Sequence, residues 1–210
     1  EAMTSLDLGD KFDTSNVTNM SYMFNWCGRE AMTSLDLGDS FDTSNVTDMY
    51  GMFAECGRKK MTDLNLGSKF NTAKVTDMSN MFNSTGHEVM NGLNLGLLFD
   101  TSKVTNMNWM FYDCGGALMT SLDLGPAFTN ISSSNEKMFE GWSNLTIYAP
   151  EAIYQDKNNF KLNTDATISA INYTRGTINP RYRTEWIKES VTVDTTNKNI
   201  QIKLRGRTNA

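Results

Sequence analysis

A unit of 29 residues recurs through most of this chain, and this repeat constrains the fold more than any other feature. The second copy reads MTSLDLGDSFDTSNVTDMYGMFAECG (residues 32–57). The five copies begin at evenly spaced methionines: Met3, Met32, Met61, Met90 and Met119. A fixed period of about 20–50 residues is typical of solenoids, whose units bury a continuous core only by stacking on one another. The repeat therefore predicts a stack of coils.

Each copy contains two kinds of hydrophobic spacing. In the first half, Leu6 and Leu8 alternate with polar residues, which predicts a half-buried strand that ends at Gly9. In the second half, apolar residues three and one apart predict one face of a short helical segment that ends at Gly28. We expect the apolar positions to be buried in every intact copy, at the equivalents of Leu6, Leu8, Phe12, Val17, Met20, Met23 and Phe24.

The chain changes character after the fifth copy. The stretch NLTIYAP (144–150) predicts one last strand, and AIYQDKNNFKL (152–162) is placed to cap the open end of the stack. Further on, ESVTVD and NIQIKLR flank a turn-forming stretch and predict a β-hairpin. We therefore expect a solenoid with its cap over residues 1–162 and a hairpin-containing β module over residues 163–210.

Charge and hydropathy argue against two classes of partner. The net charge is −5, and residues 1–170 hold 11 Lys and Arg against 21 Asp and Glu. An acidic stack is a poor match for phosphate backbones, so we expect no nucleic-acid partner. No apolar run approaches the roughly 18 residues that a membrane span needs, so we expect no membrane insertion of this stretch of chain.

Three cysteines occupy one position of the repeat. They are Cys27, Cys56 and Cys114, and the third copy has Thr85 in that place. Side chains stacked at one position run parallel, whereas a disulfide needs converging side chains with Cα atoms about 4.4–6.8 Å apart. A zinc site needs four converging ligands, and the only histidine is His87. We expect three free thiols, no metal and no cofactor.

The chain shows no motif for nucleophilic, metal or phosphate chemistry. Four carboxylates are expected to line up along the strand face as a solvated polar ladder: Asp7, Asp36, Asp63 and Asp123. Glycoside hydrolysis needs a cleft with two unlike carboxyl environments, which a repeated ladder does not provide. We therefore expect no enzyme, and a polysaccharide-acting solenoid enzyme is the remote alternative.

Aromatic residues at positions that differ between copies are the candidates for partner contact. They are Tyr22, Trp26, Tyr50, Trp109 and Tyr112, and the other copies place Gly, Ser, Asn, Glu or Asp there. The scaffold does not require these rings, and exposed aromatic residues suit contact with protein or sugar. The alternative is that some of them fold back onto neighbouring coils.

The pairing of MTSLDLG with NVTDMxxMFxxC resembles the repeat of BspA-like leucine-rich-repeat surface proteins of bacteria, over about residues 3–162. The ending NLTIYAPEAIYQ resembles the way such arrays close, and the later strands resemble the opening of a small Ig-like module. The resemblance implies a right-handed solenoid on a cell surface that acts as an adhesin or partner-binding array. The chain departs from leucine-rich repeats where an Asn usually follows the strand: Lys11, Ser40, Lys69, Leu98 and Ala127 stand there.

These observations and the resemblance give one expected architecture and function. The fold class is α/β and rich in β-structure, a right-handed leucine-rich-repeat-like solenoid of about five 29-residue coils, each a strand plus a short helical segment, followed by a small β segment. The function is that of a non-enzymatic, extracellular cell-surface protein that binds a protein or glycan on a host or neighbouring cell. A passive spacer is the alternative. Ice binding is a weaker third, through two threonine ladders that are scattered and not paired on one flat strand: Thr4, Thr33, Thr62 and Thr120, and Thr14, Thr43, Thr72 and Thr101.

Overall fold

The computed structural model describes residues 2–9, 12–142, 145–150, 153, 167–171, 186–194 and 199–206. The chain divides into two compact units, Glu1–Ile171 and Asn172–Ala210. The predicted cap at 152–162 lies outside the described residues except for Ile153, which is buried.

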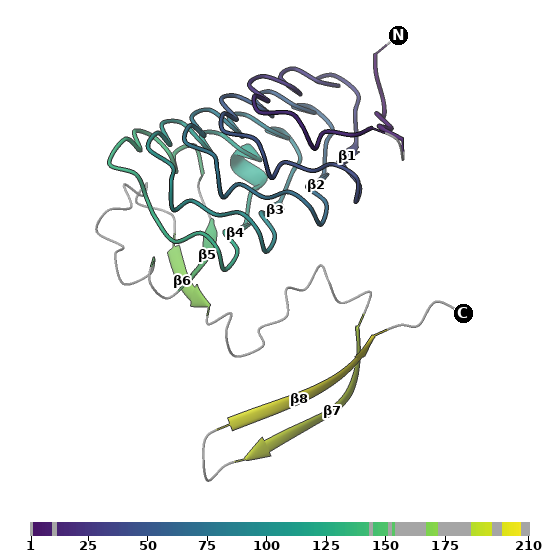
Figure 1. The fold of residues 1–210 in the computed structure, drawn as a ribbon, viewed down its shortest axis with the longest axis vertical. Coiled ribbons are helices and arrows are strands. Elements are labelled where there is room, and N and C mark those ends of the chain that lie inside the picture. The colour runs from purple at the N-terminus through teal and green to yellow at the C-terminus, as the bar shows by residue number, and fades with distance from the viewer. Residues whose placement is uncertain are drawn as a thin grey trace. The chain divides into compact units, whose positions relative to one another are not determined.

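Successive copies of the repeat lie side by side in the first unit (Figure 1). Strands β1 (Ser34–Asp36) and β2 (Asp63–Asn65) pair in parallel with Leu35 opposite Leu64, an offset of one repeat. The next four strands pair in parallel in chain order: β3 (Gly92–Asn94), β4 (Ser121–Asp123), β5 (Thr146–Pro150) and β6 (Thr167–Ile171). A second line of parallel bridges joins Asn19, Asp48, Asp77, Asn106 and Ser134. The bridges therefore bond all five copies in one line, and the strands form a second line that is divided between β2 and β3.

The core between these lines is built from columns of identical side chains. Neighbouring phenylalanines stack nearly parallel, with ring centroids 5.4 Å apart between Phe53 and Phe82 and 6.3 Å apart between Phe70 and Phe99. These are favourable offset geometries for aromatic pairs. The opening methionines of copies 2–5 are fully buried beside them: Met32, Met61, Met90 and Met119.

The first copy departs from the prediction that every copy buries its apolar residues. Leu6, Leu8 and Val17 are only half-buried, and Phe12 and Met23 remain 39% and 37% exposed. The side chains are of the same type as those buried in copies 2–4. The difference arises because the first copy has a neighbouring coil on one side only among the described residues.

The predicted helical segment is wrong. Residues Ser21–Cys27 and their equivalents in copies 2–4 are turns. The 3₁₀ helix η1 (Gly116–Leu118) is the only helix with defined bounds in the described part of the chain. The main-chain N–H of Tyr22, Phe24 and Trp26 donates to the next coil, at Tyr50, Met52 and Ala54 respectively, over 2.8–2.9 Å. The N–H groups between them bond three residues back, as in turns.

Left-handed backbone explains why no helix forms there. Tyr22 and Trp26 have φ angles of 59° and 61°, which a right-handed helix cannot contain. Apolar residues three and one apart suit a helix face, but the same spacing also suits consecutive turns stacked coil on coil.

A buried threonine column lies three residues after the position where leucine-rich repeats usually place an Asn, and it bonds each coil to the next. The Thr43 hydroxyl donates to the carbonyl oxygen of Asn71 at 2.8 Å and accepts the Asn71 N–H at 2.7 Å. The corresponding hydroxyls also donate to the next coil: Thr14, Thr72 and Thr101. These four threonines are at most 2% exposed, so they do not form the surface ladder that ice binding would need.

The corner after each strand depends on an acidic or amide side chain and a glycine. In the first copies, Asp7 and Asp36 each accept the N–H of the glycine two residues later, at 2.8 Å. The predicted carboxylate ladder is partly wrong. Asp36 is opposite Asn65 in the paired strands, and Asp63 lies two residues earlier, opposite Ser34. The glycine itself is required, since Gly67 has φ 77° and a Cβ there would lie 2.1 Å from the carbonyl oxygen of Gly38.

The second unit contains the strands β7 (Trp186–Asp194) and β8 (Asn199–Gly206), which pair antiparallel. Val191 is opposite Ile202 and Val193 is opposite Ile200, as the predicted hairpin requires. The expected Ig-like module stays a prediction. Among the described residues, no helix has the length and apolar character to cross a membrane.

Candidate functional site

The stacked turns form one side of the coils, which we call the turn face, and it carries the predicted contact residues. Each turn segment contains two residues with left-handed φ, at the positions of Tyr22 and Trp26. Other copies place Gly51, Asn80 and Lys137 at the first position. They place Glu55, Ser84, Asp113 and Gly141 at the second. Three predicted contact residues therefore have left-handed backbone: Tyr22, Trp26 and Trp109.

Tyr22 and Tyr50 form an aromatic pair across the first two coils. Their ring centroids lie 4.8 Å apart in an edge-to-face arrangement, and Tyr22 is 52% exposed while Tyr50 is half-buried. The Tyr22 ring lies over Gly51, where a Cβ would come within 2.9 Å of it. A hydrogen bond with the Tyr50 hydroxyl raises the pKa of Tyr22. Gly51 thus makes room for the ring of the preceding coil.

Trp26 is the most exposed of the candidates, at 59%. The Arg29 guanidinium lies 4.7 Å from its ring centroid, within the range of a cation–π contact. Arg29 is held by ion pairs to Glu30 and Glu55, at 3.0 and 3.2 Å. The ring therefore has one face covered by an anchored cation.

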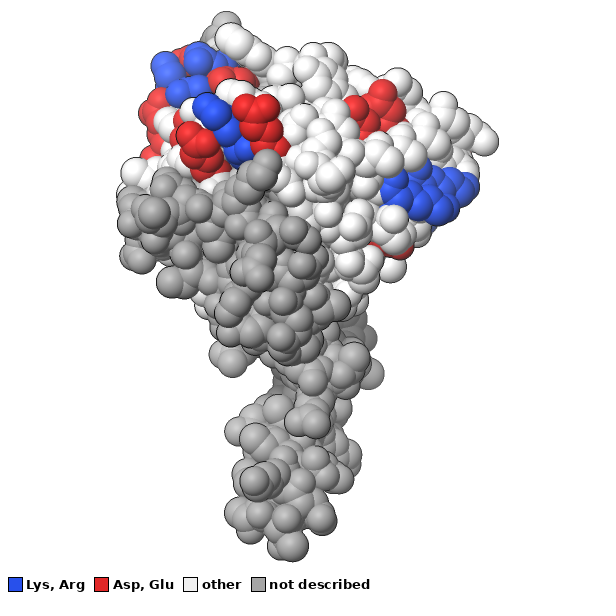
Figure 2. Space-filling view, turned by 90° about the vertical axis from the view of Figure 1, so that its left-hand side faces the viewer, with Lys and Arg blue, Asp and Glu red and all other residues white. Residues whose placement is uncertain are grey.

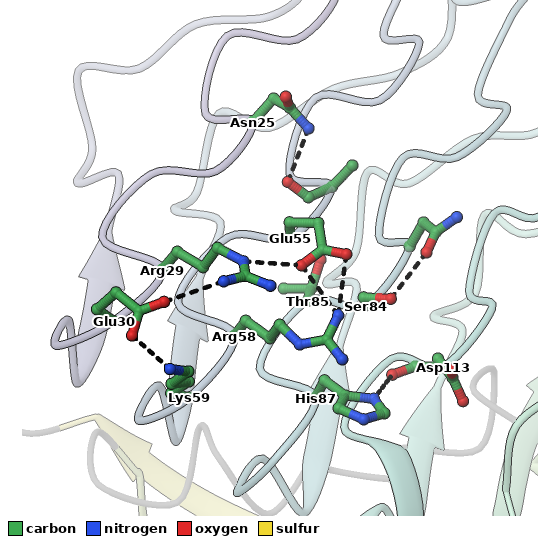
Figure 3. A network of polar contacts seen from close by, with 12 residues as sticks. Asn25, Arg29, Glu30, Glu55, Arg58, Lys59, Ser84, Thr85, His87 and Asp113 are labelled. Atoms are coloured by element: carbon green, nitrogen blue, oxygen red, sulfur yellow. Dashed lines mark hydrogen bonds and ion pairs between the residues drawn. The ribbon is translucent and has the colours of Figure 1, made fainter.

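The carboxylates that hold Arg29 belong to a network over neighbouring coils (Figure 3). Arg58 approaches Glu55 at 2.9 Å, and Lys59 approaches Glu30 at 2.5 Å. The Lys59 ammonium lowers the pKa of Glu30, and Glu55 raises the pKa of Arg29. On the face drawn in Figure 2, acidic and basic groups lie together near one end, and most of the remaining described surface is uncharged.

Trp109 and Tyr112 form a second aromatic pair in the fourth copy. Their centroids are 4.8 Å apart, and the Lys137 ammonium lies 4.8 Å from the Trp109 ring and 5.9 Å from the Tyr112 ring. Both rings are half-buried. The structure thus joins Tyr22 to Tyr50 and Trp109 to Tyr112. The third copy, with Asn80 and Asn83 at the corresponding positions, lies between the two pairs.

The sequence did not predict two basic residues that contact the aromatic rings of the turn face. Arg29 and Lys137 each place a cation over an aromatic ring. Arg29 follows Trp26 by three residues, a spacing that suggests contact within a turn. Lys137 comes from the next coil, and only the register of the copies could have indicated it.

The three cysteines are free thiols, and Cys27 differs from the others in exposure. Cys27 is half-buried, whereas Cys56 and Cys114 are fully buried. A hydrogen bond from the Cys56 thiol lowers the pKa of Cys27 to about 7, and the same bond raises the pKa of Cys56. Burial raises the pKa of Cys114 to about 12. Only Cys27 combines access with thiolate character near neutral pH.

Iodoacetamide should therefore alkylate Cys27 selectively in the folded protein. The rate should fall as the pH drops through about 7, because protonation removes the reactive thiolate. Peptide mass spectrometry over a pH series measures this, and a denatured sample should show all three thiols. Cys56→Ala serves as the control, since loss of the hydrogen-bond donor should slow Cys27 at pH 7. Equal labelling of all three native thiols would contradict the assignment.

Comparison with known proteins gives a family but no individual relative. The model of a family described as "Mycoplasma protein of unknown function, DUF285" matches residues 4–87 and, in an overlapping match, residues 27–144. No curated protein and no solved structure matches the chain. The family agrees broadly with the expected bacterial surface repeat protein, and no model of a BspA-like or leucine-rich-repeat family matches the chain. Since its matches extend over more than half of the sequence, the chain belongs to the Mycoplasma family DUF285.

Proposed function

We propose that this protein is a non-enzymatic bacterial cell-surface repeat protein that binds a protein or glycan partner through the aromatic residues of its turn face. The scaffold in this proposal is a right-handed, leucine-rich-repeat-like solenoid. Parallel strands joined by a crossover connection are right-handed in nearly all proteins, which supports that hand. The proposed location is extracellular, on the surface of the cell.

The observation that carries the proposal is the presence of large aromatic residues on left-handed backbone. Bulky residues are rare at such φ angles, and each costs about 1–2 kcal/mol relative to right-handed backbone. Equivalent positions in other copies hold Gly51 and Asn80, which accept this backbone easily. Tyr22 and Trp26 are more than half exposed, so core packing does not compensate for this cost. Strained residues of this kind cluster at functional sites.

The non-enzymatic part rests on how the strand-face carboxylates are used. Asp7, Asp36 and Asp123 each accept the N–H of the glycine two residues further on, over 2.8–3.0 Å. Side chains committed to closing a corner are poor candidates for acid–base work, which needs groups directed at a substrate. The polysaccharide-acting enzyme is accordingly the weakest alternative.

A passive spacer is the second candidate, and the coil-to-coil bonding favours it. Main-chain hydrogen bonds and stacked phenylalanines run unbroken from the first copy to Phe139. A spacer function, however, does not explain why exposed aromatic residues occur on left-handed backbone. Binding assays distinguish the two functions directly.

The double variant Tyr22→Asn, Trp26→Asn should lose binding without losing stability. Asn tolerates left-handed backbone, so the free energy of unfolding should change by less than about 1 kcal/mol. Affinity should fall about 30-fold or more, since exposed Tyr and Trp anchors are commonly worth about 2 kcal/mol. Glycan arrays and immobilised extracellular matrix proteins identify a ligand of the unmodified protein, and biolayer interferometry then compares the variants.

The matched control is Asn80→Gly, at the position of Tyr22 in the third copy, which has no aromatic residue on its turn face. Glycine accepts the φ of 58° found at Asn80, so both stability and binding should remain unchanged. A large stability loss in the double variant would assign Tyr22 and Trp26 to packing. Unchanged affinity would remove them from the contact surface, and the absence of any ligand would favour the spacer.

A further inference from the structure

Two exposed leucines lie on the corner that follows β3, in the fourth copy. Leu97 is 61% exposed and Leu98 is 44% exposed. Outside the first copy, the only other large hydrophobic side chain exposed among the described residues is that of Leu118, which precedes β4. The fourth copy is bonded to a coil on each side, so the exposure of Leu97 and Leu98 does not arise from an end of the stack.

Other copies have polar or charged residues at these two positions. The pair is Asp39 and Ser40 in the second copy, and Ser68 and Lys69 in the third. All four of these side chains are exposed to solvent. The fold therefore does not require leucine at either position.

The main chain holds this corner in the same way whichever side chain it carries. The carbonyl oxygen of Leu98 accepts the N–H groups of Thr72 and Asp100, at 3.2 and 3.0 Å. In the preceding coil, the carbonyl oxygen of Lys69 accepts the N–H of Thr43 at 3.4 Å. The leucine side chains therefore project from a backbone whose hydrogen bonds do not depend on them.

The fifth copy extends the apolar surface of this corner. It has Pro126 and Ala127 at the positions of Leu97 and Leu98, and both are half-buried. We call these four residues the leucine patch. Aliphatic side chains offer no hydrogen-bond partner to the hydroxyl groups of a sugar, and burial of a polar group without a partner is unfavourable. The leucine patch therefore suits contact with a protein and not with a glycan.

The size and the surroundings of the leucine patch restrict its occupant. A stable dimer needs about 800 Å² of surface from each partner, far more than four partly exposed side chains provide. Residues 90–147, which include the patch, also hold five carboxylates against two lysines. A second copy of this chain would bring acidic coils against acidic coils, which is unfavourable. Charge complementarity instead favours a partner with positive charge.

We propose that the leucine patch binds a segment of a partner protein that carries exposed aliphatic side chains and a net positive charge. The two leucines form the apolar anchor of this contact, since a few well-placed side chains supply most of the binding energy of protein interfaces. The carboxylates of the same coils attract the partner and favour one orientation. The patch shares no residue with the turn face, so the inference does not depend on the binding proposed there.

The test measures binding of short, fluorescently labelled synthetic peptides to the full chain by fluorescence polarisation. The peptides combine leucine with lysine, leucine with glutamate, or serine with lysine, and the leucine–lysine peptides should bind most tightly. The variant Leu97→Asp, Leu98→Ser gives the fourth copy the residues of the second, so its urea midpoint should equal that of the unmodified protein. Its affinity for leucine–lysine peptides should fall at least about tenfold, because the apolar anchor is lost. Leu97→Ser alone, as in the third copy, should weaken binding in the same direction.

The matched control is Leu118→Ser, because this leucine is 54% exposed but lies outside the patch. It should leave the affinity unchanged, as should the double variant of Tyr22 and Trp26. Equal binding of the serine–lysine or leucine–glutamate peptides would overturn the proposal, as would unchanged affinity in the Leu97, Leu98 variant or no binding of any peptide. A dimer of the unmodified protein in light scattering, lost in that variant, would assign the patch to a second copy and overturn the proposal as well.

Discussion

Replacing Phe99 by alanine should lower the free energy of unfolding by about 3–5 kcal/mol. The ring is fully buried and stacks between Phe70 and Phe128 at centroid distances of 6.3 Å on both sides. Its removal leaves a cavity in a column whose neighbours are fixed by main-chain hydrogen bonds between coils, so collapse into the space is limited. Urea unfolding followed by circular dichroism measures the change.

Phe12→Ala is the matched control, since Phe12 occupies the same position of the first copy. That ring is 39% exposed, and its one stacking partner in the described part of the chain is Phe41, at 6.3 Å. Its removal should cost less than half as much as the loss of Phe99. Equal losses from the two substitutions would mean that the stack does not bury these columns as described.

Thr43→Val should destabilise the protein by about 2–4 kcal/mol although it preserves the shape of the side chain. The hydroxyl is the partner of both the N–H and the carbonyl oxygen of Asn71, within 2.8 Å. Valine leaves these two main-chain groups unpaired in a corner where Thr43 itself is fully buried, and each such group costs about 1–3 kcal/mol. The midpoint of chemical unfolding is the measurement.

Thr47→Val separates the buried column from threonines on the surface. Thr47 is exposed, and its hydroxyl donates to the carbonyl oxygen of Thr18 at 3.2 Å, where water can replace it. This substitution should change the free energy of unfolding by less than about 0.5 kcal/mol. A result for Thr43→Val as small as this would show that other groups close the corner.

Much of the fold could be predicted from the sequence because five copies show which positions of one coil lie next to the same positions of the following coil. Alternating leucines identify the strands of copies 2–5, whereas the strand predicted at Leu6 and Leu8 of the first copy is absent. The offset of one repeat places Leu35 opposite Leu64. Aligning MTSLDLG with MTDLNLG would also have placed Asp63 opposite Ser34, since the acidic residue there precedes the leucine. That error came from matching residue type instead of position.

Other features could not be predicted because one pattern fits two backbones. The spacing of Met20, Met23 and Phe24 suits a helix face and a series of stacked turns equally. The sign of φ decides between them, and the side chains of Tyr22 and Trp26 do not favour left-handed backbone. Gly51 and Asn80 at equivalent positions of other copies were the available signal.

The sequence predicted which residues belong to the candidate site but not which of them contact one another. Variation between copies identified the five aromatic residues. Their grouping depends on contacts between coils, such as Tyr22 with Tyr50 and Lys137 with Trp109. These contacts join different positions of adjacent copies, so a comparison of equivalent positions does not reveal them.

The direction of the hydrogen bonds between coils has a mechanical consequence. The turn N–H groups, such as that of Phe24 bonded to Met52, point from each coil to the next. Tension that separates neighbouring coils loads these bonds one row at a time, as in opening a zipper, and does not shear many rows together. Each released coil would add about 100 Å of extended chain, given roughly 3.4 Å per residue. The stack would then unfold under tension one coil at a time, in steps of equal length. This would limit the peak force on any molecule bound to it.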